Sequence, residues 1–230
     1  MIGFEDLEFV GHTVSKGQVG LHPDNVQKIN VARRPQTKKE VRSFMGLVGY
    51  YRNYIPNFAA ISAPLTDLTK KGKANNVEWG DAQENAFITL KQMLMNEPIL
   101  QLPDLTKRFI LQTDASNKGI GAVLLQDNEG VLMPVAYASK KLLPRQQAYS
   151  TIEKECLALV WAVKKFHVYL YGREFTLQTD HQPLVYMNQS RMTNDRVMRW
   201  ALSLQPYRIH IEAIKGSQNV GADFLSRSVN

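Results

Sequence analysis

Two short motifs of identical composition each place an aspartate directly after an apolar run. One extends from Leu111 to Asp114 and the other from Leu177 to Asp180, and both read Leu-Gln-Thr-Asp. Such apolar runs, bounded by turn residues, predict buried strands, so each aspartate is expected where a strand leaves the core. A helical pattern over residues 150–169 separates the two motifs. Since a strand, a helix and a later strand can lie parallel in one sheet, we expect Asp114 and Asp180 side by side at one edge.

Two adjacent carboxylates repel each other and are costly to remove from water unless a cation lies between them. Taken singly, Asp114 or Asp180 is better explained as a turn residue after its strand. The repeated context favours a metal site instead, because functional groups gather at the C-terminal ends of parallel strands.

The helical pattern between the motifs carries three charged residues close to its start. Ser150 and Glu153 have the spacing of a capping box, which gives Glu153 a structural role. Lys154 is expected to be solvated. Glu155 falls on the side that turns to the core, which is formed by Ile152, Cys156, Leu159, Val163 and Phe166. A buried acid there needs a cationic partner, either a metal ion or a salt bridge, and metal ligation is the preferred interpretation.

A fourth acid, Asp223, opens a short helix expected over residues 220–227. Helix N-termini favour aspartate for electrostatic reasons alone, so a structural role explains Asp223 equally well. Carboxylate ligands without sulfur select magnesium or manganese over zinc. Four carboxylates around two such ions form a site for two-metal phosphodiester hydrolysis, in which one ion activates water and the other stabilises the leaving oxygen.

The second half of the chain predicts an α/β (mixed α+β) fold with a mixed sheet of five strands. The expected strands are 107–114, 119–126, 131–138, 174–180 and 207–214. The expected helices are 150–169, 183–188, 193–205 and 220–227.

The first half is expected to be mainly helical after a β-hairpin in residues 1–22 that turns at Lys16-Gly17. Four helices are expected. The first has Asp24 as its N-cap, and the second starts at a capping box formed by Thr37 and Glu40. The third and fourth cover Ala59–Leu68 and Ala82–Met95. Pro98 and Pro103 bracket a linker-like stretch, so we expect two domains, 1–102 and 103–230.

Composition and charge narrow the class of protein. The 230 residues are 44% hydrophobic and 21% charged, which is typical of a soluble globular protein, and no stretch is apolar enough to cross a membrane. A formal charge of +7 and a pI of about 9.4 favour a polyanionic partner. The single cysteine, Cys156, excludes intrachain disulfides and fits an intracellular location, cytoplasmic or in a particle. The oligomeric state is left open.

Several longer motifs resemble the ribonuclease H domain of gypsy-like LTR-retrotransposon polyproteins. They are Asp114-Ala-Ser, Tyr149-Ser-Thr-Ile-Glu-Lys-Glu155-Cys-Leu-Ala, Phe175-Thr-Leu-Gln-Thr-Asp180-His and Asn219-Val-Gly-Ala-Asp223-Phe-Leu-Ser-Arg. Upstream motifs are similar to the end of the palm, the thumb and the connection segment of the same reverse transcriptases. These are Phe9-Val-Gly-His12, Arg42-Ser-Phe-Met-Gly-Leu-Val-Gly-Tyr-Tyr-Arg52, Ala63-Pro-Leu65, Trp79 and Leu90-Lys91.

This resemblance covers nearly the whole chain and implies a ribonuclease H-like sheet preceded by a mainly helical thumb and connection segment. It implies that Asp114, Glu155, Asp180 and Asp223 are the catalytic carboxylates and bind two Mg²⁺ ions, with Mn²⁺ as a substitute. The implied reaction is cleavage of the RNA strand of RNA–DNA hybrids, leaving 5′-phosphate and 3′-OH ends. The implied partners are the hybrid and the remainder of the reverse transcriptase polyprotein.

The chain departs from the family pattern at two places. The family's polymerase active site, a Tyr-x-Asp-Asp loop and an earlier aspartate, lies upstream of any residue present, so the chain is not expected to polymerise by itself. Residues 214–222 lack the histidine that cellular ribonucleases H carry before the last aspartate, and Gly221 and Phe224 replace the family's usual residues beside Asp223.

The candidate nucleic-acid contacts are Ser116, Arg196 and Arg199. Phosphate-binding cations must flank the acids, because the acids repel the backbone they cleave, although each arginine taken singly is better explained as a solvated surface charge. A second hypothesis is a catalytically silent nucleic-acid-binding or scaffold remnant of the polyprotein. A third is a strand-transferring integrase, which shares the sheet architecture and would act on DNA ends without needing Glu155.

Overall fold

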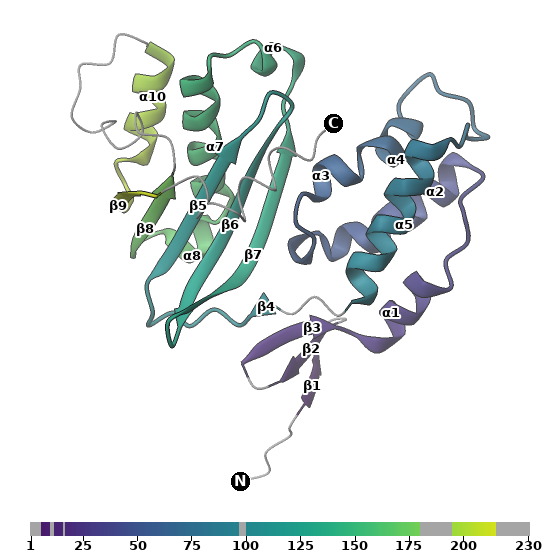
Figure 1. The fold of residues 1–230 in the computed structure, drawn as a ribbon, viewed down its shortest axis with the longest axis horizontal. Helices are drawn as coiled ribbons and strands as arrows, with labels where there is room; N and C mark the ends of the chain where they lie inside the picture. The colour runs from purple at the N-terminus through teal and green to yellow at the C-terminus, as the bar shows by residue number, and fades with distance from the viewer. Residues whose placement is uncertain (1–5, 10–11, 16, 97–99, 180–194, 215–230) are drawn as a thin grey trace. The chain divides into compact units, whose positions relative to one another are not determined.

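The structure, a computed structural model, describes residues 6–9, 12–15, 17–96, 100–179 and 195–214 (Figure 1). The chain divides into two compact units, Met1–Leu102 and Pro103–Asn230. Asp180 and Asp223, and the helices predicted over 183–188 and 220–227, lie outside the described residues.

The first unit contains a small antiparallel sheet with the strand order β1-β2-β3-β4. Its strands are β1 (Asp6–Phe9), β2 (His12–Ser15), β3 (Gln18–Leu21) and β4 (Leu100–Gln101). Gly17, in the turn between β2 and β3, has a φ of +78°, which glycine adopts without steric cost. The predicted hairpin is therefore confirmed as the β2–β3 pair, and β1 and β4 extend it on either side.

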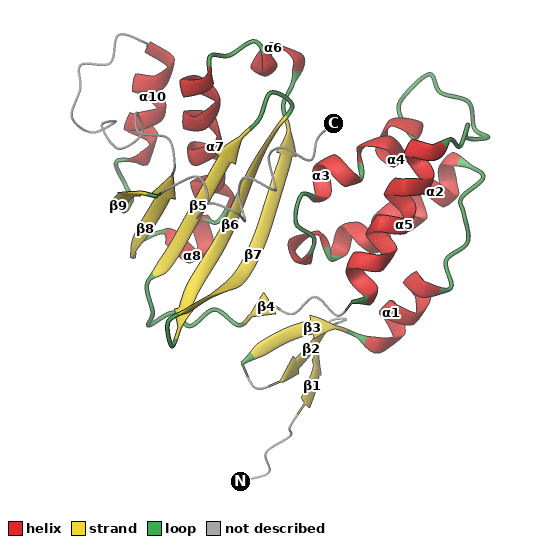
Figure 2. Cartoon of the chain, viewed as in Figure 1, coloured by secondary structure: helices red, strands yellow, loops and turns green. Residues whose placement is uncertain are grey.

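Helices make up the rest of the first unit (Figure 2). They are α1 (Pro23–Asn30), α2 (Lys38–Tyr50), the 3-10 helix η1 (Arg52–Tyr54), α3 (Phe58–Ile61), α4 (Ala63–Leu68) and α5 (Asp81–Met95). The predicted capping box of α2 is confirmed, since Thr37 and Glu40 each accept a hydrogen bond from the other's backbone N–H. The apolar sides of α2 and α5 are buried and meet at Phe44 and Phe87, whose ring centroids are 4.7 Å apart.

Two helix ends in the first unit differ from the prediction. His22, not Asp24, caps α1, and its Nδ1 accepts a hydrogen bond from the Asp24 N–H at 3.2 Å. Pro23 explains the difference, because proline is favoured at the first helical position and moves the cap one residue earlier. The helix predicted over Ala59–Leu68 is divided into α3 and α4. Pro64 has no N–H with which to continue the first helix, and it lies in the first turn of the second, which begins at Ala63.

The second unit contains a five-stranded sheet with the strand order β7-β6-β5-β8-β9. Its strands are β5 (Phe109–Ala115), β6 (Gly119–Asn128), β7 (Val131–Lys141), β8 (Glu174–Thr179) and β9 (Arg208–Ala213). Strands β5, β6 and β7 are antiparallel, whereas β8 runs parallel to β5 and β9 parallel to β8. The predicted mixed α/β sheet is confirmed.

The two Leu-Gln-Thr-Asp motifs lie beside each other in this sheet. Leu111 pairs with Leu177, and Gln112 pairs with Gln178, in a parallel register. The predicted adjacency of the two motif-bearing strands is therefore confirmed for the part of each motif that the structure describes.

The helices of the second unit are α6 (Pro144–Gln147), α7 (Thr151–Lys165), α8 (His167–Leu170) and α10 (Asp195–Leu204). The single helix predicted over 150–169 is in fact α7 and α8, which meet at Phe166. Helix α7 lies on one face of the sheet, and α10 packs against α7 (Figure 1). The core between α7 and the sheet includes Phe109, Leu111, Cys156, Leu159, Val163, Phe175 and Leu177.

Candidate active site

The C-terminal end of β5 and the start of α7 lie at the same end of the sheet (Figure 1). Strand β5 turns into β6 through residues 116–118, and the first residue of β6, Gly119, pairs with the last residue of β7, Lys141. The Leu142 N–H then donates to the Lys118 carbonyl at 2.8 Å, and the chain continues through α6 into α7. Ala158 of α7 packs with Ile120 and Leu142 in one buried cluster. The β5–β6 turn and the first turns of α7 therefore share this end of the fold.

Asp114 is the last residue but one of β5 and is 6% exposed. It lies opposite Gly121 of β6, so no side chain extends from the neighbouring strand position. Side chains alternate along a strand, and Ile110 packs with Val123 and Leu125 on the face away from the α7 core. Asp114 shares that face with Ile110, and its carboxylate is held close to the end of the sheet.

Glu155 comes from the second turn of α7 and is 5% exposed. The predicted capping box sets the start of this helix: Ser150 accepts from the Glu153 N–H at 3.3 Å, and Glu153 accepts from the Ser150 N–H at 2.9 Å. Burial, followed by the nearby charges of Glu155 and Glu153, raises the pKa of Cys156 to about 12. Both acids therefore lie close enough to the Cys156 thiol to disfavour its ionisation.

A hydrogen bond links the segments that carry these two acids. Lys154, directly before Glu155, donates from Nζ to Oδ1 of Asn117 at 2.9 Å, and Asn117 lies three residues after Asp114. The structure thereby brings Asp114 and Glu155 to one end of one unit. The other two acids of the predicted set, Asp180 and Asp223, lie outside the described residues.

Two predictions about α7 are wrong. Lys154 is only 8% exposed, not solvated, because it lies four residues before Ala158 on a side where small residues let the helix approach the sheet. Ile152 is 45% exposed, because the buried cluster between α7 and the sheet begins only at Cys156. Sequence reasoning missed Lys154, although the small residues Ala158 and Ala162 on the same side were a signal.

Of the predicted nucleic-acid contacts, Arg196 and Ser116 have other partners in the fold. The Arg196 guanidinium donates to Glu153 Oε1 at 2.7 Å and lies 4.2 Å from the centroid of the Tyr149 ring. The Ser116 hydroxyl accepts from the Gly119 N–H at 3.0 Å and so closes the β5–β6 turn. Arg199 is exposed on α10. A contact of these three side chains with nucleic acid stays a prediction.

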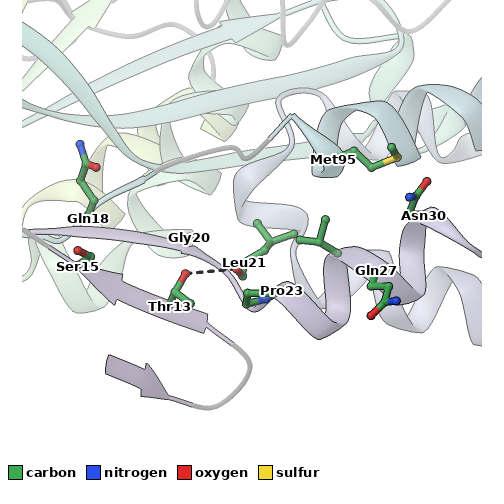
Figure 3. Close-up of a pocket in the computed structure, with 10 residues that line it drawn as sticks. Thr13, Ser15, Gln18, Gly20, Leu21, Pro23, Gln27, Asn30 and Met95 are labelled. Atoms are coloured by element: carbon green, nitrogen blue, oxygen red, sulfur yellow. Dashed lines mark hydrogen bonds between the residues drawn. The ribbon is translucent and has the colours of Figure 1, made fainter. Parts of the chain in front are cut away.

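The first unit holds a separate pocket of about 470 Å³ among β2, β3, α1 and the end of α5 (Figure 3). Its lining residues are Thr13, Ser15, Gln18, Gly20, Leu21, Pro23, Val26, Gln27, Asn30 and Met95. None of them carries an acid, a base or a thiol. These lining residues therefore offer no titratable side chain for acid–base chemistry.

The donor set at the end of the second unit consists of carboxylate oxygens, which suit magnesium or manganese. Across residues 6–9, 12–15, 17–96, 100–179 and 195–214, no three His, Cys, Asp or Glu side chains converge as metal ligands. Of the four predicted ligands, Asp114 and Glu155 are the two that lie within the described residues, and metal binding by them stays a prediction. None of the helices in these ranges is long and apolar enough to cross a membrane.

Comparison with known sequences places the chain among retroelement proteins. The family described as "RNase H-like domain found in reverse transcriptase" matches residues 104–207. The retrovirus-related Pol polyprotein from transposon 297 of Drosophila melanogaster is 41% identical over 223 residues, which are 97% of this chain and 21% of that protein. The Pol polyprotein from transposon gypsy of the same species is 40% identical over 97% of this chain and 22% of its own length. The Tf2-3 polyprotein of Schizosaccharomyces pombe is 35% identical over 97% of this chain and 17% of its own length.

Solved structures share the fold at lower identity. The foamy viral protease-reverse transcriptase in complex with dsDNA has a TM-score of 0.80 at 22% identity, over 93% of this chain and 45% of that chain. The same enzyme in complex with RNA/DNA hybrid has a TM-score of 0.77 at 24% identity, over 92% of this chain and 29% of that chain. The present chain spans about a fifth of the length of the curated relatives. It belongs to the family of gypsy-like retrotransposon Pol polyproteins and contains the RNase H-like domain of their reverse transcriptases.

Proposed function

We propose that the chain is a metal-dependent endonuclease that cleaves the RNA strand of RNA–DNA hybrids, as part of a longer reverse transcriptase. The observation that carries the proposal is the placement of two buried acids, Asp114 on β5 and Glu155 on α7, at one end of an RNase H-like unit. Membership of the Pol polyprotein family supports the substrate class. The foamy viral relative of similar fold is described in complex with RNA/DNA hybrid.

In this proposal Asp114, Glu155, Asp180 and Asp223 hold Mg²⁺, with two ions expected and Mn²⁺ as a substitute. Buried carboxylates are unfavourable without a compensating charge, so the burial of Asp114 and Glu155 fits this role. When bound, the ions supply a nucleophilic water and charge stabilisation of the leaving oxygen. The water oxygen would bond to phosphorus and lose a proton to solvent while the bond to the 3′-oxygen breaks, and the 3′-oxygen would take up a proton in its place. The products are a 5′-phosphate and a 3′-OH.

The chain's own residues contribute position and charge. The capping box at Ser150 fixes the start of α7, and with it the place of Glu155 relative to the sheet. The formal charge of +7 favours approach of a polyanion. We propose that residues 1–102 are the end of the palm, the thumb and the connection segment, and that residues 103–230 are the nuclease domain. Polymerase activity is not expected from this chain alone.

The test is a cleavage assay with a hybrid whose RNA strand carries the label. The chain is expected to cut the RNA strand in Mg²⁺, and to cut neither the DNA strand nor single-stranded RNA. Asp114→Asn and Glu155→Gln should each lower the rate by about 100-fold or more, because loss of about 3 kcal/mol of transition-state stabilisation has that effect. Glu174→Gln is the matched control, since Glu174 is an exposed acid at the opposite end of the sheet, paired with Arg108.

Two results would contradict the proposal. Binding of the hybrid with no turnover in either Mg²⁺ or Mn²⁺ would favour a catalytically silent binding or scaffold remnant. Joining of DNA ends that does not require Glu155 would favour an integrase-like strand transferase.

A further inference from the structure

Lys154 is an unusual residue in an RNase H-like unit because its long cationic side chain is almost wholly buried. It is 8% exposed, and lysine is rarely buried to that degree unless it has a partner. The partner is Asn117, whose Oδ1 accepts from Nζ at 2.9 Å. Lys154 lies one helical turn before Ala158, the residue of α7 that packs with Ile120 and Leu142.

Asn117 belongs to a turn that several hydrogen bonds hold in place. The Ser116 hydroxyl accepts hydrogen bonds from the N–H groups of Lys118 and Gly119, at 3.2 and 3.0 Å, and donates to the Gly119 carbonyl at 3.1 Å. The Lys118 carbonyl in turn accepts from Leu142 at 2.8 Å. Because the turn is held in this way, a bond to Asn117 attaches α7 to a fixed part of the sheet and not to a loose loop.

The start of α7 is also held from its other side. Glu153, directly before Lys154, accepts a hydrogen bond from Arg196 of α10 at 2.7 Å. Glu153 therefore connects the first turn of α7 to α10, and Lys154 connects it to the β5–β6 turn. Glu155 follows immediately, so its position depends on both attachments.

The hydrogen bond between Lys154 and Asn117 joins the two acid-bearing segments directly. Asp114 is three residues before Asn117, and Glu155 is one residue after Lys154. A change in this bond would alter the spacing of the two carboxylates without removing either of them. Metal sites depend on such supporting contacts, whose loss typically weakens metal affinity by about 10- to 100-fold.

We propose that Lys154 is a positioning residue which, through Asn117, sets the spacing of Asp114 and Glu155 and thereby the affinity for Mg²⁺. The inference rests on the proposed function and adds a residue to its machinery. It differs from a phosphate contact by Lys154, because the Nζ is bonded to the fold and the side chain is buried.

The experiment uses Lys154→Met, which removes the ammonium group and keeps a long unbranched side chain, and Asn117→Ala, which removes the acceptor. Each is expected to raise the Mg²⁺ concentration for half-maximal rate by about 10-fold. The KM for the hybrid should change by no more than about twofold, since uniform substrate binding is untouched. The double variant should be about as impaired as either single variant, because the two side chains act through one bond. Lys154→Arg, which keeps a cationic donor, should restore most of the affinity.

A second measurement does not depend on catalysis. Titration of Mn²⁺ into the full chain, followed by calorimetry without substrate, should show the same weakening in Lys154→Met and Asn117→Ala. Lys118→Met is the matched control, because Lys118 is an exposed lysine in the same turn. Circular dichroism will show whether Lys154→Met folds. If it does not, Asn117→Ala is sufficient to test the inference, because Asn117 is exposed and its truncation leaves no cavity.

The outcomes separate this inference from the proposed function. The inference would be overturned if Lys154→Met raised the KM for the hybrid, made hybrid binding less dependent on salt, and left the Mn²⁺ affinity unchanged. That result would show that Lys154 contacts phosphate. Unchanged Mn²⁺ affinity in both variants would overturn it as well. A wild-type chain that binds Mn²⁺ but cuts no hybrid would refute the proposed function, and weaker Mn²⁺ binding by Lys154→Met would still support the positioning role.

Discussion

Gln112 of β5 donates a hydrogen bond from its side-chain amide to Gln178 of β8, at 2.9 Å. The two residues occupy the same place in the two Leu-Gln-Thr-Asp motifs and pair directly in the parallel register. Gln178 in turn donates to Glu212 of β9 at 3.4 Å. This row of polar side chains crosses three strands, two residues before the acid in the first motif. It ties together the strands on which the position of that acid depends.

The first prediction concerns this row. Gln112 is 5% exposed, so Gln112→Ala should leave the side-chain oxygen of Gln178 without its donor in a partly buried place. The free energy of unfolding should fall by about 1–2 kcal/mol, measured by urea denaturation. Gln205→Ala, at an exposed position after α10, should change it by less than about 0.5 kcal/mol. Equal effects of the two variants would show that the bond between Gln112 and Gln178 does not stabilise the sheet.

The repeat explains how much of the sheet could be predicted from the sequence. Two strand-like runs of six residues, 109–114 and 175–180, end in the same four letters and predict two buried strands, and a helix between them implies that they are parallel. The capping boxes at Thr37 and Ser150 were predictable for a similar reason, since each depends on residues three positions apart. Local spacing is visible in one sequence without knowledge of what lies across the fold.

The contacts that the sequence did not reveal depend on distant partners. Lys154 is buried because Asn117, 37 residues earlier, accepts its hydrogen bond. Arg196 is engaged by Glu153, which is 43 residues away, so its role could not be read from its own surroundings on α10. Ile152 has the spacing of a core residue, but it precedes the part of α7 that meets the sheet. A helical pattern identifies a side of a helix and leaves open how far the neighbouring sheet extends.

The second prediction tests the pair formed by Arg196 and Glu153. Arg196 is partly exposed, so Arg196→Met should cost only about 0.5–1 kcal/mol of stability. Glu153→Ala should cost more, about 1–2 kcal/mol, because Glu153 also accepts the Ser150 N–H in the capping box. A double-mutant cycle measured by thermal unfolding should give a coupling energy different from zero. Arg199→Met, on the exposed side of α10, is the control, and a coupling energy of zero would contradict the prediction.

The third prediction concerns the stability of the metal-free chain. Asp114 and Glu155 are both about 95% buried, and a buried charge opposes folding when no cation accompanies it. Asp114→Asn should therefore raise the melting temperature in a chelator by roughly 2–4 °C, the shift expected from about 1 kcal/mol in a chain of this size. Mg²⁺ should raise the melting temperature of the wild-type chain and have little effect on the variant.

Glu174→Gln serves as the reference for this comparison, since it removes an exposed acid at the other end of the sheet. It should leave both the metal-free melting temperature and the Mg²⁺ response close to those of the wild type. A melting temperature of the wild-type chain that does not respond to Mg²⁺ would count against a metal site at Asp114.

The fourth prediction uses Cys156 as a reporter of the packing beneath Glu155. The thiol is 1% exposed, and burial raises its pKa to about 12. It should therefore not react with a soluble disulfide reagent at pH 8 while the chain is folded, and it should react fully in denaturant. Fast reaction of the folded chain would show that the first turns of α7 open readily.

The final prediction concerns pH and the first unit. His12 lies against the rings of Tyr50 and Tyr54, and its Nδ1 is 2.9 Å from the Tyr54 hydroxyl. Burial lowers the pKa of His12 in the folded chain. As the pH falls below about 6.5, the pKa of an unperturbed histidine, His12 is therefore protonated more readily in the unfolded chain than in the folded chain. This contribution to stability is present above about pH 6.5 and is lost as the pH falls through the pKa of His12 in the folded chain.

His12→Phe, which keeps an aromatic ring, should lose less stability than the wild type between pH 7 and pH 5. His210→Gln is the control, because His210 is exposed, and it should retain the pH dependence of the wild type. Parallel pH curves for wild type and His12→Phe would show that the buried imidazole carries no such linkage.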